Sequence, residues 1–193
     1  MKVHYGSMNP PPRLPPIGAV ELRALKAAGA EAIFATVDES RAHLRVWLPW
    51  VDSSQDPSAT RAFLEQHERS AAEGRTAGYA LWENGRVIGI AGLHDIDASN
   101  RAAAIGYWLA AAAQGRGLIT ETVRRLLDLG FGGLELERIE IRCATGNTRS
   151  WAVPERLGFA FEGVLRHRQW LNGRPVDLRL YSLLAGEWAA RRL

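Results

Sequence analysis

The sequence contains one cysteine, two lysines and no long apolar run, and these shortages narrow the classes of protein it fits. Its single cysteine, Cys143, permits neither an internal disulfide nor a Cys/His metal cluster. We therefore expect a protein of a reducing, cytoplasmic compartment, with no metal and with Cys143 as a small buried hydrophobic residue. No run of about 18 apolar residues is present to span a membrane, and without an apolar stretch behind a basic start we expect no secretory signal.

Lysine occurs only at Lys2 and Lys26, so arginine supplies nearly all of the positive charge. The chain has 24 basic and 21 acidic residues, and the arginines are scattered instead of forming one stripe. Nucleic-acid binding normally requires a clustered basic surface, so we expect no nucleic-acid partner. A length of 193 residues suits one domain with a packed core. We expect an irregular proline-rich segment at 1–16 and a single domain over 17–193.

The apolar patterns predict alternating strands and helices that build one sheet. Asn84-Gly85 and Asn172-Gly173 each separate two apolar runs, which indicates a β-hairpin because both turn residues need positive φ. Alternating and helical spacings assign the remaining elements. The predicted strands are 18–23, 78–83, 86–93, 103–109, 137–144, 160–170 and 175–184. The predicted helices are 24–49, divided near residue 39, then 57–73, 116–131, 148–157 and a last turn at 185–192. This order indicates an α/β (α+β) fold.

The loop at 114–120 (QGRGLIT), between a predicted strand and a predicted helix, is the segment that indicates chemistry. Its glycines allow close approach of a ligand, and the first amides of the helix have no helical partner. Together with the helix dipole, they would bind an anion such as a pyrophosphate. An ordinary tight loop with a solvated Arg116 fits the same residues. The loop is neither a P-loop nor a complete dinucleotide fingerprint, because the residues that define those motifs are missing.

Gln114 and Gly117 resemble the acetyl-CoA signature Gln/Arg-x-x-Gly-x-Gly/Ala of the GNAT acetyltransferase superfamily. A finer resemblance, to the Rim-type ribosomal-protein N-terminal acetyltransferases, extends over most of the chain. Agreement at so many ordered positions is not expected by chance. The matching segments are 40–50 (SRAHLRVWLPW), 105–109 (IGYWL), 147–150 (NTRS), 154–159 (PERLGF), 170–173 (WLNG) and Asp177.

The resemblance implies the GNAT fold, a mixed and mostly antiparallel central sheet of about seven strands flanked by about four helices. It also implies that acetyl-CoA is the co-substrate, without a metal. The pantetheine arm would lie where strand 105–109 separates from strand 138–143. The implied cofactor-binding residues are Tyr107, Trp108 and Leu109 in the strand, Gln114, Gly115, Arg116, Gly117, Leu118, Ile119 and Thr120 in the loop, and Asn147 and Ser150 after the second strand.

The resemblance also gives Ser150 a catalytic role. In Rim-type enzymes a serine takes the place of the tyrosine that many GNAT enzymes use as general acid, and Ser150 would protonate the departing thiolate. The residues alone permit a plainer interpretation. Asn147 and Ser150 would then cap a helix, and Tyr107 and Trp108 would be ordinary strand residues.

The general base departs from the family pattern. The family often places a glutamate just before the Ile-Gly-Tyr-Trp strand or before the last hairpin, but this chain has Ala104 and Gln169 there. His167 shares a strand face with Gln169, and its unperturbed pKa of about 6.5 suits a base. Glu162 on the same strand is a second candidate. Both also fit residues with no catalytic role.

The missing carboxylate favours an acceptor that loses its proton easily. About a tenth to a fifth of an α-amine is neutral at pH 7, against well under about 0.1% of a lysine amine. The resemblance implies the N-terminal α-amine of a ribosomal protein as acceptor. A small-molecule amine, such as an antibiotic, a polyamine or an amino-acid derivative, is the alternative. A non-catalytic acetyl-CoA-binding module is a third hypothesis.

The acceptor is expected to bind near Trp50, which follows the predicted helical segment 24–49, and near Gln169 and Trp170 in the last predicted hairpin. A wide groove there would favour a peptide, and a closed pocket would favour a small molecule. Exposed apolar area around Trp47, Trp50 and Trp170 would line either the acceptor site or the contact of a homodimer.

Overall fold

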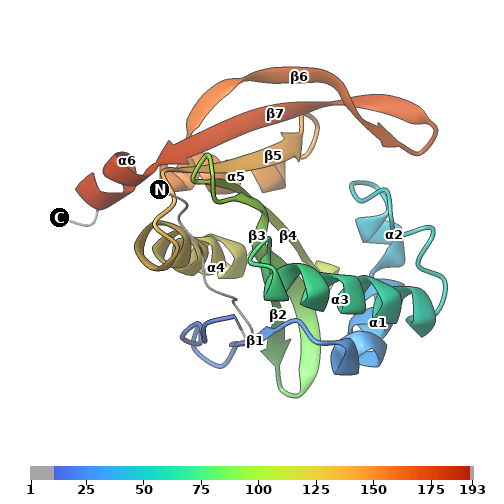
Figure 1. Ribbon diagram of the computed structural model, residues 1–193. Helices are drawn as coiled ribbons and strands as arrows, with labels where there is room; N and C mark the ends of the chain where they lie inside the picture. Colours follow the sequence, from blue (N-terminus) through green and yellow to red (C-terminus); the bar gives the residue numbers. More distant parts are fainter. Residues whose placement is uncertain (1–10, 192–193) are drawn as a thin grey trace.

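One seven-stranded sheet, in the order β1-β2-β3-β4-β5-β7-β6, forms the centre of the computed structural model, which describes residues 11–191 (Figure 1). Neighbouring strands are antiparallel except β4 and β5, which are parallel. The predicted α/β class, with a mixed and mostly antiparallel sheet, is confirmed. The strands are β1 (Glu21–Ala24), β2 (Ala77–Glu83), β3 (Arg86–Asp97), β4 (Ala102–Leu109), β5 (Arg138–Ala144), β6 (Ala160–Leu171) and β7 (Arg174–Leu184).

Residues 11–191 form six α-helices, against the prediction of about four main helices. The additional helices are short, since 24–49 divides into a 3-10 turn and two helices, and the last turn is a helix of its own. The predicted helix 116–131 ends early because glycines in 128–133 (DLGFGG) disfavour it, and a π-helical turn replaces its end. The helices are α1 (Ala30–Glu39), α2 (Arg41–Leu44), α3 (Pro57–Ala72), α4 (Leu118–Leu127), α5 (Thr148–Leu157) and α6 (Ala185–Ala190).

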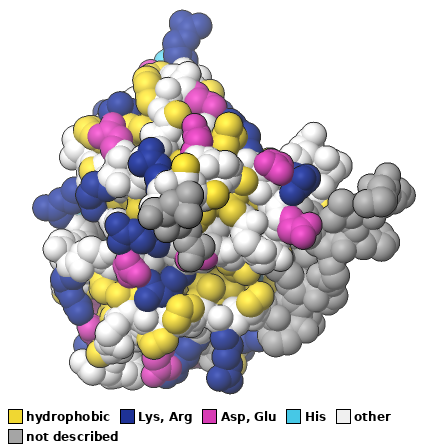
Figure 2. All heavy atoms as spheres, turned by 90° about the vertical axis from the view of Figure 1, so that its left-hand side faces the viewer, with side chains coloured by type: hydrophobic (Ala, Val, Ile, Leu, Met, Phe, Trp, Pro, Cys, Tyr) yellow, Lys and Arg dark blue, Asp and Glu magenta, His cyan; other side chains and the backbone are white. Residues whose placement is uncertain are grey.

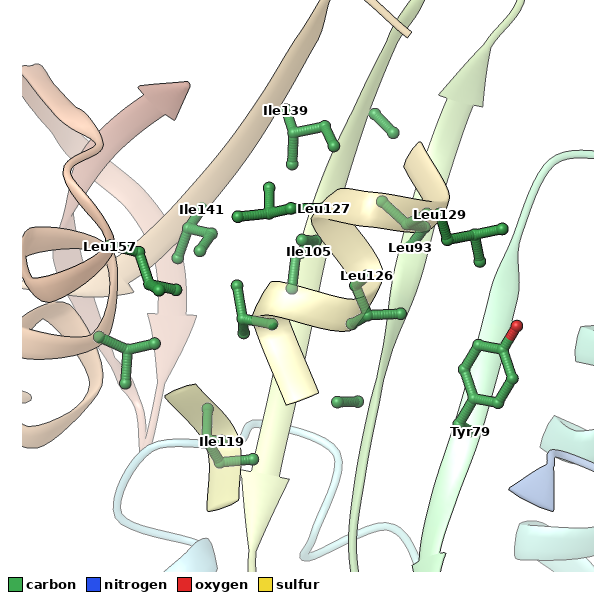
Figure 3. Packing of buried hydrophobic residues seen from close by; sticks show 14 of the residues in the cluster. Tyr79, Leu93, Ile105, Ile119, Leu126, Leu127, Leu129, Ile139, Ile141 and Leu157 are labelled. Carbon is green, nitrogen blue, oxygen red and sulfur yellow. The ribbon is translucent and has the colours of Figure 1, made fainter. Parts of the chain in front are cut away.

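The core has two parts, one on each face of the sheet. Residues of α1 and α3 pack with Ala80 and Val87 on one face. The larger part lies on the other face, where α4 and α5 cover the sheet and Tyr79 and Leu81 point. In Figure 3, Leu126 and Leu127 of α4 lie among side chains of the strands. The two cores are separate because successive strand residues point to opposite faces.

The sheet opens between β4 and β5. Their pairing ends at Ile105 and Ile141, whereas β4 continues to pair with β3 as far as Leu109. Beyond Ile141, β5 pairs only with β7. The segment 106–109 therefore has no strand on its β5 side, which confirms the predicted separation of these two strands. Ala110 donates to the carbonyl of Ile88 on the β3 side (2.9 Å), so strand alternation turns the N–H of Leu109 toward the opening.

The last two strands form a long hairpin that extends past the other strands, with its end on the same side of the molecule as α2 (Figure 1). The strand β6 is an edge of the sheet. Its register against β7 shifts between Leu165 and Gln169, so residues 166–168 have no partner in the ladder. At the hairpin turn, the side-chain amide of Asn172 donates to the carbonyl of Arg45, just after α2 (3.2 Å).

The chain from residue 11 to residue 16 has no helix or strand, and the first ten residues of the predicted irregular segment lie outside the described part. The guanidinium of Arg125 donates to the carbonyls of Pro15 and Pro16, which ties this segment to α4. None of the described helices has the length and apolar character required to cross a membrane. On the face shown in Figure 2, basic and acidic side chains are interspersed.

Candidate active site

A pocket of about 920 Å³ lies where β4 and β5 separate. Its walls come from α2 and the turn after it, the end of β4, the first turn of α4, and the start of α5. All the residues predicted to bind the cofactor line this one pocket: Tyr107, Trp108, Leu109, Gln114, Gly115, Arg116, Gly117, Leu118, Ile119, Thr120, Asn147 and Ser150.

The N-terminus of α4 opens into the pocket without a side-chain cap. The side chain of Asp56 caps α3 and that of Asn147 caps α5, but no side chain bonds the first amides of α4. Gly115 and Gly117 have φ of +78° and +73°, a conformation that glycine adopts without strain. The uncapped amides and the helix dipole make this end of the pocket suitable for an anion.

Three arginines line the pocket, and they differ in how their charge is balanced. Arg116 forms two hydrogen bonds with Glu83 (2.9 and 2.5 Å), which raise the pKa of the guanidinium. Arg149 and Arg156 instead donate to neutral oxygens, of Gln114 (2.7 Å) and of Thr120 (2.8 Å). Their positive charge is therefore not compensated by a carboxylate and is available to an anionic ligand.

A chain of polar side chains joins α2, the glycine loop and α5 along one wall. Nε2 of His43 lies 2.5 Å from Nε2 of Gln114, and Arg149 donates to the other end of the same amide. Trp47, four residues after His43, faces the loop between β5 and α5, where a Cβ on Gly146 would lie 3.7 Å from its ring. The segment after α1 therefore closes one side of the pocket.

Ser150 lies at the closed end of the pocket, between a tyrosine and a cysteine. Its hydroxyl is placed to donate to Sγ of Cys143 (3.2 Å) or to the hydroxyl oxygen of Tyr107 (3.4 Å). The Tyr107 hydroxyl donates to the backbone carbonyl of Ser150 (2.8 Å). Burial raises the pKa of Cys143 and raises that of Tyr107 well above its usual range. All three groups are therefore protonated and uncharged at neutral pH.

Asn147 combines the two interpretations that the sequence left open. Its side-chain oxygen accepts from the backbone N–H of Ser150 (3.2 Å), so it is the N-cap of α5. It also lines the pocket, and its Nδ2 group has no partner within residues 11–191. The cap fixes Ser150 in the first turn of α5, and the amide donors of Asn147 are free for a ligand.

The predicted acceptor residues Trp50, Gln169 and Trp170 do not line this pocket. Trp50 instead packs against Trp108, with ring centroids 6.3 Å apart, and is therefore one residue removed from the pocket. Gln169 and Trp170 lie in the β6–β7 hairpin, where the side chain of Trp170 is 67% exposed. The hairpin touches the segment after α2, which contributes to one wall of the pocket, so these residues lie outside the pocket near that wall.

The two candidates for the general base also lie outside the pocket. Glu162 pairs with Arg138 and accepts from Ser182 (2.7 Å), and these bonds lower its pKa to about 2. It is also at the end of the sheet opposite the pocket, because Arg138 begins β5 and the pocket follows the end of that strand. His167 is exposed in the irregular part of β6. A base at either position stays a prediction that this geometry does not favour.

Sequence reasoning did not single out His43, Arg149 and Arg156 as site residues. A signal for His43 was present, because His43 and Trp47 are four residues apart and so share one helical face. Arg149 lies between two predicted site residues. No Asp or Glu lines the pocket, and within residues 11–191 no group of three or more His, Cys, Asp and Glu side chains is placed to hold a metal.

Comparison with known proteins places this geometry in a family. The model of the acetyltransferase (GNAT) domain family matches residues 19–160. The N-acetyltransferase YdaF of Bacillus subtilis (strain 168) is 34% identical over 174 residues, which are 90% of this chain and 95% of YdaF. The ribosomal-protein-serine acetyltransferase of Escherichia coli (strain K12) is 27% identical, over 85% of this chain and 92% of its own length.

A solved structure of RimL, described as a ribosomal L7/L12 alpha-N-protein acetyltransferase in complex with coenzyme A, has a similar fold. It superposes with a TM-score of 0.85 at 26% identity and covers 90% of this chain and 98% of RimL. In that structure the same architecture binds coenzyme A.

Proposed function

The chain belongs to the GNAT family of N-acetyltransferases, and we propose that it transfers the acetyl group of acetyl-CoA to the N-terminal α-amine of a protein, a ribosomal protein in the first place. The observation that carries the proposal is one pocket that joins an uncapped helix N-terminus, an opened strand edge and Ser150. The names of the E. coli relative and of RimL support the protein acceptor.

The donor would bind along the pocket in the order of its chemical groups. The first amides of α4 would hold the pyrophosphate, and Arg149 would add an uncompensated charge beside it. The opened edge of β4 would pair with the amides of the pantetheine arm, with Asn147 as a further donor. This arrangement would bring the thioester to Ser150.

In the transfer step, the residues of the chain hold charge and deliver one proton. The backbone N–H of Leu109 would stabilise the negative charge that develops on the acetyl oxygen as the amine attacks. The new C–N bond replaces the C–S bond, and the hydroxyl of Ser150 would protonate the departing sulfur. The proton that leaves the acceptor nitrogen then restores Ser150 through solvent.

The groups in the pocket wall that can accept a proton indicate which class of amine the site suits. His43 is the one imidazole that lines the described pocket, and no carboxylate does. An α-amine needs little help at neutral pH, whereas removing the proton of a lysine amine costs about 3–4 kcal/mol more. A site of this composition therefore suits an α-amine better than a lysine.

Release of CoA from acetyl-CoA, followed with a thiol reagent, tests the proposal. The acceptors would be peptides with a free N-terminal Ser or Ala, the same peptides blocked at the N-terminus, free lysine, polyamines and aminoglycosides. We expect turnover only with a free peptide N-terminus. Turnover restricted to a small amine would contradict the proposal and favour the alternative acceptor class. Tight acetyl-CoA binding without turnover on any amine would favour a non-catalytic module.

A further inference from the structure

The β6–β7 hairpin carries three arginines that have no partner in the described chain. All three are exposed, and their side chains form no hydrogen bond or ion pair within residues 11–191. They are Arg166, Arg168 and Arg174. Every other arginine between residues 17 and 191 has at least one. Of the four arginines without a side-chain partner in residues 11–191, three therefore lie in this hairpin and the fourth is Arg13.

An irregularity of β6 holds this charge outward. Residues 166–168 have no partner on β7, and His167 between the two arginines has a φ of +50°. The carboxylate of Asp177 on β7 accepts the backbone N–H of His167 (2.7 Å), which fixes the bulge. A bulge interrupts the regular ladder and changes the direction of its side chains, and here it leaves both arginines outside the pairing with β7. The other carboxylate of the hairpin, on Glu162, is neutralised by Arg138.

The same hairpin exposes an aromatic anchor beside the site. Trp170 follows the bulge and is 67% exposed, the most exposed large hydrophobic side chain among the described residues. Asn172, at the turn, bonds the segment after α2, which lines the pocket. The turn of the hairpin therefore lies against a segment that lines the pocket, and Trp170 stands two residues before this contact. Arginine and tryptophan are the residues that most often dominate the binding energy of protein interfaces.

We propose that the β6–β7 hairpin binds an acidic segment of the protein acceptor. The N-terminus of the acceptor would enter the pocket, and the Asp or Glu side chains that follow it would contact the hairpin. This inference rests on the proposed function and adds the charge of its substrate. A second copy of the chain fits less well, because the chain as a whole carries a net positive charge. A nucleic acid fits less well too, since Arg45 and Arg142 beside the hairpin are paired with Asp52 and Glu140 and add no free charge to it.

Two peptides of equal length and identical first residues test the proposal, one with glutamates and the other with glutamines at the following positions. Binding is measured by the anisotropy of labelled, N-terminally blocked peptides, so the result does not depend on acetyl transfer. We expect the glutamate peptide to bind about tenfold more tightly and to lose this advantage at high salt. In the variant R166E/R168E/R174E, the preference should disappear.

Arg13→Glu is the matched control, since Arg13 is also exposed and unpaired but lies near α4 and β2 and not in the hairpin. It should leave the preference unchanged. The thermal stability and acetyl-CoA affinity of the triple variant show that it is folded, and R168E alone is the milder variant if it is not.

Equal affinity for the two peptides, or a preference that survives in the triple variant, would overturn the proposal. So would tighter binding of a single-stranded RNA of equal charge. Acetyl transfer to the unblocked peptides is scored separately. Binding of the glutamate peptide without transfer would contradict the proposed function alone, and transfer to both peptides at the same KM would contradict the hairpin proposal alone.

Discussion

In the pocket, Arg116, Arg149 and Arg156 each donate to a partner of the same chain, whereas Arg166 and Arg168 in the hairpin donate to none. The pocket side chains are thus held in place before a ligand arrives, which lowers the entropy lost on binding. The side chains of the hairpin have no such partner to hold them and would lose more entropy on binding. The difference matches the proposed division of the site, with a preorganised pocket for the acetyl donor and an exposed hairpin for the proposed protein acceptor.

Replacing Ser150 by Ala should slow the chemical step in the pocket and leave peptide binding by the hairpin unchanged. We expect kcat to fall about a hundredfold, because the general acid is lost, with the KM of acetyl-CoA changed little. Steady-state kinetics with a free N-terminal peptide measure this. Thr148→Ala is the control, because Thr148 lines the same pocket but its hydroxyl forms no hydrogen bond within residues 11–191, so kcat should stay near that of the parent. A loss of kcat below about threefold in the Ser150 variant would remove Ser150 from the mechanism.

Replacing Arg149 by Ala should weaken donor binding. Its charge is not balanced by a carboxylate, so its loss should raise the KM of acetyl-CoA about tenfold, while kcat at saturation stays near that of the parent. Arg86→Ala removes an arginine that pairs with Glu39 outside the pocket and should leave this KM unchanged. An unchanged KM in the Arg149 variant would show that the donor does not reach this charge.

Replacing Trp170 by Ala should act on the hairpin side only. We expect the KM of a peptide acceptor to rise about fivefold and the affinity for acetyl-CoA to stay the same, because the exposed ring lies outside the pocket. Calorimetry with acetyl-CoA and kinetics with the peptide separate the two. Phe63→Ala, another exposed aromatic side chain, is the control. Weaker acetyl-CoA binding by the Trp170 variant would contradict the division between the two regions.

Replacing Glu162 by Gln should have the smallest effect on activity and a measurable effect on stability. The pKa of Glu162 is about 2 in the folded chain, below its ordinary value of about 4.3. The bonds of its carboxylate therefore stabilise the fold fully at pH values above about 4.3, and this stabilisation is lost as the pH falls toward 2. We expect the variant to lose about 1 kcal/mol at pH 7, and the difference to vanish as the pH falls toward 2. Denaturant unfolding at several pH values measures it. A large loss of kcat would instead restore Glu162 as the base.

Most of the fold could be predicted because its signals are local. Asn84-Gly85 and Asn172-Gly173 fixed two hairpins, and the predicted strand 78–83 became 77–83. The loop 114–120 was found for the same reason, since a glycine pair and a helix start lie next to each other in the chain. What depends on neighbours along the sequence is visible in the sequence.

The rest depends on side chains that meet from distant segments. His43 and Gln114 are 71 residues apart, and no periodicity indicates that they touch. The bond between Arg138 and Glu162, which turns a candidate base into a structural ion pair, likewise joins separate strands. The bulge at 166–168 interrupts an apparently regular strand, because Asp177 across the ladder holds it. These contacts follow from the packed structure and not from local pattern.

The bulge in β6 also bears on how the molecule avoids its own copies. An edge strand offers a row of unpaired N–H and C=O groups to any other strand, which is a common origin of aggregation. Here residues 166–168 interrupt that row, and two of the three residues in the break are arginines. A variant with a regular strand in place of the bulge and apolar residues in place of its arginines would expose a continuous edge strand that is prone to aggregate. The bulge thus shortens the stretch of β6 to which the edge of another strand can pair.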